Sequence, residues 1–122
     1  IKRKKIIHER YKKKINKIKY LSISSTPYYA SSNYWLNILE IKINLTRKKM
    51  SKIIKYFLKN KIEVRPLWYP SHLQNKFKDC QTYKLNNINK IYKNRLCLPS
   101  SSQLTKKQQD FICKKLKFFF KK

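Results

Sequence analysis

The stretch of residues 62–74, I-E-V-R-P-L-W-Y-P-S-H-L-Q, constrains the fold of this chain more than any other segment. It begins as a strand, because the apolar residues Ile62 and Val64 alternate with charged neighbours. Pro66 then fixes its own φ, offers no amide donor and biases Arg65 toward an extended backbone. The strand is therefore expected to end near Pro66.

The loop after Pro66 is too apolar and aromatic for an ordinary solvated turn, so we expect it to lie on another surface. Two interpretations stay open. In the first, Trp68 and Tyr69 cap the hydrophobic core. In the second, the loop is a ligand wall: Arg65 donates to a carboxylate or phosphate, the aromatic rings support a flat or sugar-like group, and His72 makes a polar contact.

The charge of the chain is extreme: 32 Lys and Arg residues stand against 5 Asp and Glu residues, a net charge of +27. A field of this strength attracts nucleic acid or anionic membrane. The lysines occur in every segment, however, in a chain with no glycine that is crowded with Ile, Asn, Tyr and Phe, as an AT-rich genome would encode. We therefore interpret the charge as compositional and expect only nonspecific, salt-sensitive binding of nucleic acid.

A length of 122 residues is enough for one domain with a modest core.

Cys80, Cys97 and Cys113 are far apart and form no C-x-x-C pair, so we expect free thiols in a reducing compartment and no metal site. Cys97, between two leucines, is expected in the core. We find no secretory signal and no apolar run that could span a bilayer, and we expect a cytoplasmic protein without a membrane partner.

Helical periodicity predicts three amphipathic helices and a shorter one near residues 85–92. The first helix has an apolar face formed by Ile7, Tyr11, Ile15 and Ile18. The second is capped by Thr46, and its apolar stripe consists of Met50, Ile53, Ile54, Phe57 and Leu58. The last is opened by a capping box of Thr105 and Gln108, and its apolar face consists of Phe111, Ile112, Leu116 and Phe119.

Alternation of apolar and polar residues predicts strands at residues 33–43 and 95–99, besides the one that begins at Ile62. Trp35 is expected in the core, and residues 21–32 are expected to be a polar connection. Asn60 is expected to take the left-handed conformation in the turn before Ile62. This order of elements predicts an α+β domain whose small sheet, antiparallel or mixed, is covered by helices.

Three ordered motifs resemble those of the DegT/DnrJ/StrS family of sugar aminotransferases, which use pyridoxal phosphate. Residues 65–74 are similar to the family segment R-P-L-W-x-P-x-H-L-Q, and residues 32–36, S-N-Y-W-L, to its S-N-x-W-L strand. Residues 96–101, L-C-L-P-S-S, resemble its L-C-L-P-S-G turn, with Ser101 in place of the glycine. The resemblance is greatest to the subgroup that makes amino sugars for exopolysaccharide, lipopolysaccharide and protein glycans.

The resemblance implies the small C-terminal domain of a fold type I aminotransferase, with residues 1–20 as a helix leading in from a large domain and residues 21–122 as the small domain. The large domain would make most of the contacts to pyridoxal 5'-phosphate and supply the Schiff-base lysine. No catalytic residue is therefore expected in this chain. The implied reaction transfers an amino group from an amino acid, such as glutamate, to a keto nucleotide-sugar. The implied assembly is a homodimer.

The same resemblance implies that residues of this chain bind the substrate. By this resemblance Arg65, Trp68 and His72 are expected to line the substrate side. Arg65 is the strongest candidate, because a guanidinium suits an anionic amino donor or a diphosphate. Further candidates are Tyr69, Gln74 and Asn33. Two other function classes stay open: a small basic RNA-binding or ribosome-associated protein, which would bind tightly even at high salt, and a degraded remnant without activity.

Overall fold

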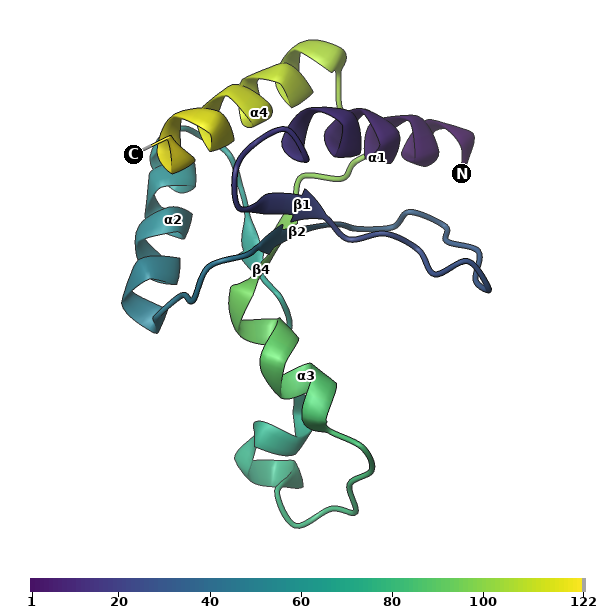
Figure 1. Cartoon of the computed structure of the whole chain (residues 1–122), viewed down its shortest axis with the longest axis vertical. Helices are drawn as coiled ribbons and strands as arrows, with labels where there is room; N and C mark the ends of the chain where they lie inside the picture. Colours follow the sequence, from purple (N-terminus) through teal and green to yellow (C-terminus); the bar gives the residue numbers. More distant parts are fainter. Residues whose placement is uncertain (122) are drawn as a thin grey trace.

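The computed structural model describes residues 1–121, apart from the side chains of residues 89 and 90. Its helices are α1 (Lys2–Ile15), α2 (Arg47–Lys59), α3 (Asn86–Ile91) and α4 (Lys106–Phe120) (Figure 1). Its strands are β1 (Leu21–Ile23), β2 (Asn37–Ile41), β3 (Arg65–Pro66) and β4 (Arg95–Leu98). Three short 3₁₀ turns are η1 (Ser71–Leu73), η2 (Asn75–Phe77) and η3 (Tyr92–Asn94). The predicted α+β class is confirmed.

The four described strands form one sheet in the order β1-β2-β4-β3, and each neighbouring pair is antiparallel. Residues 21–32 were expected to be a polar connection without a strand, and this was wrong for the first three. They form β1, in which Leu21 pairs with Ile41 and Ile23 with Leu39. Three residues are too few for alternation to reveal a strand, and β1 depends on its pairing with β2. The strand expected from Ile62 is reduced to β3, a sheet edge where proline is tolerated.

The core lies on one face of the sheet. Inward-facing strand residues such as Leu39 and Leu96 are fully buried and share one cluster with apolar residues of α1, α2 and α4. Residues on the other face, such as Ile38, Glu40 and Cys97, are half-buried. We call this second side the open face. It remains available for the groove described below.

A buried polar network joins α1 to the start of β2. Asn37 is fully buried, and its Oδ1 accepts a hydrogen bond from Nδ1 of His8 at 3.0 Å. Both the backbone N–H and the side-chain amide of Asn37 donate to Oγ of Ser100, at 2.9 and 3.0 Å. Because each partner is satisfied, the network holds α1, β2 and the turn after β4 in one register.

Two predicted helix faces are wrong by one position each. Leu58 is 66% exposed, whereas Ile53 and Phe57 of the same helix are buried. In α4 the buried stripe is Gln109, Ile112, Cys113 and Leu116, while Phe111 is exposed. A residue next to the stripe points about 100° away from it, since a helix has 3.6 residues per turn. Apolar character alone therefore misassigned both side chains.

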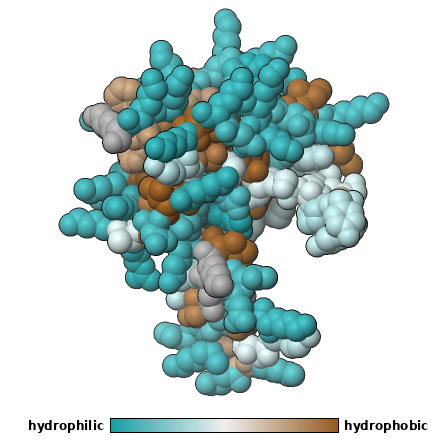
Figure 2. Space-filling model, in the orientation of Figure 1, coloured by the Kyte–Doolittle hydropathy of each residue, from teal (hydrophilic) through white to brown (hydrophobic). Residues whose placement is uncertain are grey.

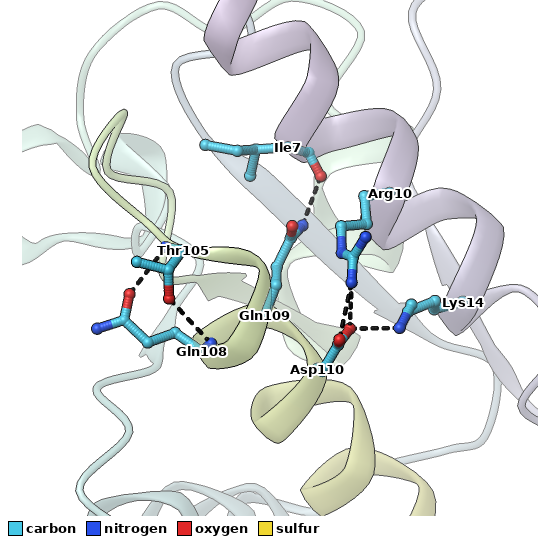
Figure 3. A network of polar contacts seen from close by, with 7 residues as sticks. All are labelled: Ile7, Arg10, Lys14, Thr105, Gln108, Gln109 and Asp110. Atoms are coloured by element: carbon cyan, nitrogen blue, oxygen red, sulfur yellow. Dashed lines mark hydrogen bonds and ion pairs between the residues drawn. The ribbon is translucent and has the colours of Figure 1, made fainter.

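The contact between α1 and α4 is polar as well as apolar (Figure 3). Asp110 accepts two hydrogen bonds from one guanidinium nitrogen of Arg10, at 2.7 Å each, and one from the amine of Lys14. The side-chain amide of Gln109 donates to the carbonyl of Ile7 at 2.6 Å. The predicted capping box of Thr105 is present at the start of α4. These contacts fix α4 across α1.

Acid should weaken this contact. The bonds from Lys14 and Arg10 hold the pKa of the Asp110 carboxyl below its ordinary value of 3.8. A lowered folded-state pKa contributes stability at pH values above 3.8, and this contribution is lost as the pH falls through the lower folded value. We expect the Asp110→Asn variant to have a lower Tm at pH 6 and a smaller loss of Tm between pH 6 and pH values below 3.8. Thermal melts of Asp110→Asn and of Asp79→Asn, a carboxylate remote in sequence from both helices, test this; identical melts would contradict it.

The turn after α2 places the left-handed residue one position later than expected. Asn60 is the C-cap with φ −90°, and Lys61 has φ 57°. The side-chain amide of Asn60 donates back to the carbonyl of Tyr56 at 2.8 Å, which keeps Asn60 on the helix. The reversal then falls on the next residue, the usual place for a left-handed cap. The turn that begins at Ser101 forms without a positive φ at that residue.

The three cysteines are free, as expected, but Cys97 is not in the core. It lies on the open face of β4, because its neighbours Leu96 and Leu98 point to the core and strand residues alternate. Cys80 is exposed and Cys113 is buried. Burial raises the pKa of the Cys113 thiol to about 11 and also raises the pKa of the Cys97 thiol.

Alkylation should follow this order. Since the thiolate is the reactive form, Cys80 should react first with iodoacetamide at pH 8, Cys97 more slowly, and Cys113 only when the protein unfolds. Peptide mass spectrometry with and without denaturant gives the three rates. Native labelling of Cys113 as fast as that of Cys80 would show that α4 does not pack as described.

Candidate functional site

A groove of about 920 Å³ lies where four segments converge beside the open face. Its walls come from the end of the β1–β2 connection, the N-terminus of α2, β3 with the loop after it, and η3. The groove is aromatic and cationic, lined among others by Trp35, Trp68, Tyr69, Tyr92, Arg47, Arg65 and Lys93. Its volume is in the range of about 300–1,000 Å³ that is usual for small-molecule sites.

Two excursions from the sheet frame the groove. Residues 24–36, which we call the arm, connect β1 to β2, and residues 67–94, which we call the lobe, connect β3 to β4. They leave the sheet in different directions, and the lobe carries α3 away from the other helices (Figure 1). The base of the lobe is tied to the sheet by the pairing of β3 with β4 and by a bond from the Leu67 N–H to the Arg95 carbonyl at 3.3 Å.

Arg65 lies in β3, opposite Cys97 of β4, and lines the groove. Its Nε and one terminal nitrogen donate to Oε1 of Glu63 at 2.8 and 2.6 Å. Both side chains are exposed, so this ion pair contributes no more than about 1 kcal/mol. An incoming carboxylate or phosphate can therefore replace Glu63 at little cost.

Trp35 is not in the core, as we expected from the sequence, but in the groove. It is 64% exposed, and its ring lies 6.0 Å from that of Trp68, which is 63% exposed. The strand begins at Asn37, so alternation does not extend to Trp35. The side-chain oxygen of Asn33 accepts a bond from the Trp35 N–H at 3.0 Å, and Tyr34 has φ 54°, so the turn directs the indole outward.

The other predicted residues are distributed around the groove. Tyr69 lines it, with its ring edge-on to Tyr92 at 5.9 Å. His72 lines a neighbouring cavity of about 670 Å³ in the lobe, which shares Trp68 and Tyr69 with the groove. Gln74 donates to the Tyr69 carbonyl at 3.1 Å, and Asn33 holds the turn before Trp35, so both shape backbone. Neither lines the groove.

Among the aromatic and cationic groove residues, the sequence analysis did not assign four to the site: Trp35, Arg47, Tyr92 and Lys93. Arg47 is the first residue of a helix, and Lys93 follows an aromatic residue. Cations are common on the surface at both kinds of position. Local pattern holds no sign that they converge on Trp68. Over the part of the chain that the structure describes, no helix is long and apolar enough to cross a membrane, and no three His, Cys, Asp or Glu side chains form a metal-binding group.

The fold matches known aminotransferase structures. Spr1654 from Streptococcus pneumoniae, described as a sugar aminotransferase, matches in its PMP-form with a TM-score of 0.83 at 18% identity, over 98% of this chain and 30% of that chain. Helicobacter pylori PseC, an aminotransferase involved in the biosynthesis of pseudoaminic acid, matches with a TM-score of 0.80 at 14% identity, over 98% of this chain and 32% of that chain. The chain therefore has the fold of one part of a sugar aminotransferase.

The sequence places it more narrowly. A model of the DegT/DnrJ/EryC1/StrS aminotransferase family matches residues 1–117, and the chain belongs to this family. EpsN of Bacillus subtilis (strain 168), which is named as a pyridoxal phosphate-dependent aminotransferase, is 28% identical over 126 residues, covering 98% of this chain and 31% of EpsN. The family resemblance seen in the three motifs is thus confirmed. The chain spans about a third of the length of the relatives it matches.

The groove does not fit a whole pyridoxal phosphate. Such a site needs a desolvated lysine for the Schiff base and a partner for the ring nitrogen. Lys93, the one lysine among the described groove residues, is exposed and lies 5.8 Å from the Tyr92 ring. Arg47 and Arg65 suit anionic groups such as phosphate or carboxylate. The described residues thus match the anionic part of a ligand and do not provide the covalent attachment.

Proposed function

We propose that this chain is the small C-terminal domain of a pyridoxal phosphate-dependent nucleotide-sugar aminotransferase. The reaction would transfer an amino group from an amino acid, such as glutamate, to a keto nucleotide-sugar in amino-sugar biosynthesis for polysaccharide. Family membership supports this proposal, and the observation that carries it is the placement of Arg65 and Trp68 in one groove beside the open face. Pyridoxal phosphate, bound mainly by a large domain, supplies the electron sink of the reaction.

In this proposal the chain binds and encloses the substrate. Arg65 exchanges Glu63 for the carboxylate of the amino donor or for the diphosphate of the sugar nucleotide. Trp68 and Tyr69 support a flat or sugar-like group, and His72 contacts the ligand from the lobe side. Because the lobe is joined to the sheet through β3 and β4, its movement would close the groove and exclude water.

The proposed partners are a large domain that carries the Schiff-base lysine and a second copy of the protein. We keep residues 1–20 as the lead-in from that large domain and residues 21–122 as the small domain. In the structure Ile7, Tyr11 and Ile15 of α1 are buried in the shared core, which holds the lead-in helix firmly on the small domain. Three free thiols support the cytoplasm as the proposed location.

RNA binding is a second candidate that no specific observation favours. The relatives reported above are aminotransferases, and hydrophilic side chains spread over most of the face shown in Figure 2 without gathering on one element. Compositional charge accounts for that distribution. Binding of RNA that persists at high salt would reopen this candidate.

The first experiment is to read the source DNA upstream of the Ile1 codon for as long as the frame stays open. A frame that encodes a large domain with a Schiff-base lysine supports the proposal. The whole protein should then transfer the amino group of glutamate to a keto nucleotide-sugar, measured by chromatography of the amino sugar nucleotide. A stop codon or an unrelated frame would refute the proposal for this chain, and salt-resistant RNA binding would then be tested.

A further inference from the structure

The groove holds two exposed indoles whose ring centroids lie 6.0 Å apart. Trp35 comes from the arm and Trp68 from the lobe, and their planes are tilted by 35°. More than 60% of each residue is exposed, and neither indole belongs to the core. Exposed aromatic surface beside a cavity is typical of a ligand site.

The turn that presents Trp35 is held from several sides. Tyr34 has φ 54°, a conformation that disfavours residues with a Cβ. Its N–H donates to Oγ of Ser32 at 3.0 Å, and its ring lies 4.9 Å from that of the buried His8. The amine of Lys4 donates to the Trp35 carbonyl at 3.3 Å. Two residues of α1 thus fix the base of the arm, and Trp35 is the rigid side of the pair.

The charge around the indoles selects an anionic ligand. Arg47, Arg65 and Lys93 line the groove, and the carboxylate of Glu63, which pairs with Arg65, lies in the adjoining cavity. Arg47 opens α2, whose first backbone N–H groups also favour negative charge. A planar ring system next to phosphate groups is the chemistry of a nucleotide, and stacking on indoles accepts any base.

The spacing of the indoles shows how such a ring enters. A planar group between two faces needs about 7 Å, twice a van der Waals contact of about 3.5 Å. The ring centroids are 6.0 Å apart and the planes are tilted by 35°, so the pair must open by at least about 1 Å. Trp35 is fixed to the body, whereas Trp68 belongs to the lobe, which is tied to the sheet at β3 and β4. A shift of Trp68 away from the arm would therefore open the pair.

We propose that Trp35 and Trp68 form a clamp for the base of a nucleoside diphosphate, with Arg47 and Arg65 on its phosphates. This inference rests on the proposed function and adds Trp35 and Arg47 to the residues that bind the nucleotide. The clamp couples nucleotide binding to the position of the lobe, since the base separates the two indoles. Lys4 and His8 act through the arm and are positioning residues.

Tryptophan fluorescence tests the clamp directly, because the chain has 2 tryptophans and both belong to it. The 122-residue chain is titrated with UDP, uridine and pyrophosphate in about 0.2 M salt, which suppresses nonspecific binding of anions. We expect UDP to quench the fluorescence and to bind more tightly than either half. Trp35→Leu should weaken UDP binding by roughly 5- to 150-fold and Trp35→Phe by much less, since loss of one stacked aromatic residue has effects of that size.

Two control variants sharpen the result. Tyr28→Leu removes a fully exposed aromatic residue of the arm and should leave UDP affinity unchanged. Arg47→Gln should weaken UDP and pyrophosphate about equally and leave uridine unchanged, because it removes a phosphate contact. Circular dichroism checks the folding of every variant, and calorimetry gives affinities for variants with altered fluorescence.

Each other outcome overturns the clamp. Equal UDP affinity in Trp35→Leu and the unmodified chain would show that Trp35 does not stack on the base. If pyrophosphate binds as tightly as UDP and UDP does not quench the fluorescence, the groove binds anions without contacting the base. Absence of UDP binding also rejects the clamp. The proposed function is judged separately by amino transfer in the whole protein, so failure of the clamp can be distinguished from failure of the proposed function.

Discussion

On the proposed function, Arg65→Ala in the whole protein is expected to lower kcat/KM for amino transfer by roughly 10- to 150-fold. Hydrogen bonds to charged groups contribute about 1.5–3 kcal/mol, and each 1.4 kcal/mol is about a factor of ten. Arg65 offers two donors that now bond the exposed carboxylate of Glu63 and are available to an anionic substrate. Initial rates at varied concentrations of glutamate and of the keto nucleotide-sugar show which substrate loses its contact.

Comparison variants separate the role of Arg65 from its charge. Arg65→Lys keeps the charge and loses the planar pair of donors, so its kcat/KM should lie between those of the alanine variant and the unmodified enzyme. Lys42→Ala removes an exposed cation that does not line the groove and should leave kcat/KM unchanged. If all three variants match the unmodified enzyme, Arg65 does not bind substrate.

Phe57→Ala is expected to lower the free energy of unfolding by about 3–5 kcal/mol, the usual cost of removing a buried phenylalanine ring. Phe57 is completely buried, and its ring meets the edge of Tyr56 at 5.4 Å. A domain of this size is stable by about 5–15 kcal/mol, so the variant should lose a large share of its stability. Urea titration followed by circular dichroism measures the loss; fluorescence reports on the groove instead, because both tryptophans lie there.

Leu58→Ala is the matched control for the core. Leu58 follows Phe57 in α2, has similar helical surroundings and is mostly exposed, so its truncation should change stability by no more than about 0.5 kcal/mol. A similar loss in both variants would show that α2 does not bury the face described here.

Local patterns in the sequence predicted most of the helical fold. Periodic apolar residues identified the four helices, and the caps at Thr46 and Thr105 formed as expected because a cap depends on residues within one turn. Alternation identified β2 and β4, whose inward-facing residues Leu39 and Leu96 are opposite each other. The segment around Arg65 and Trp68 was identified from its aromatic composition and its family resemblance, and both residues line one groove. Whether they bind substrate stays a prediction.

The tertiary structure decided what depends on partners distant in sequence. β1 exists because β2 pairs with it, and Lys61 is left-handed because Asn60 remains bonded to α2. Trp35 faces the groove because the strand begins two residues later, and no local pattern sets that boundary. The groove itself joins Trp35, Arg47, Trp68 and Lys93. The sequence alone determined most of the segments that become helices, strands and the aromatic loop, since these depend on residues close in the chain. Only the packing of the arm, α2 and the lobe around the sheet edge determined which side chains share a site.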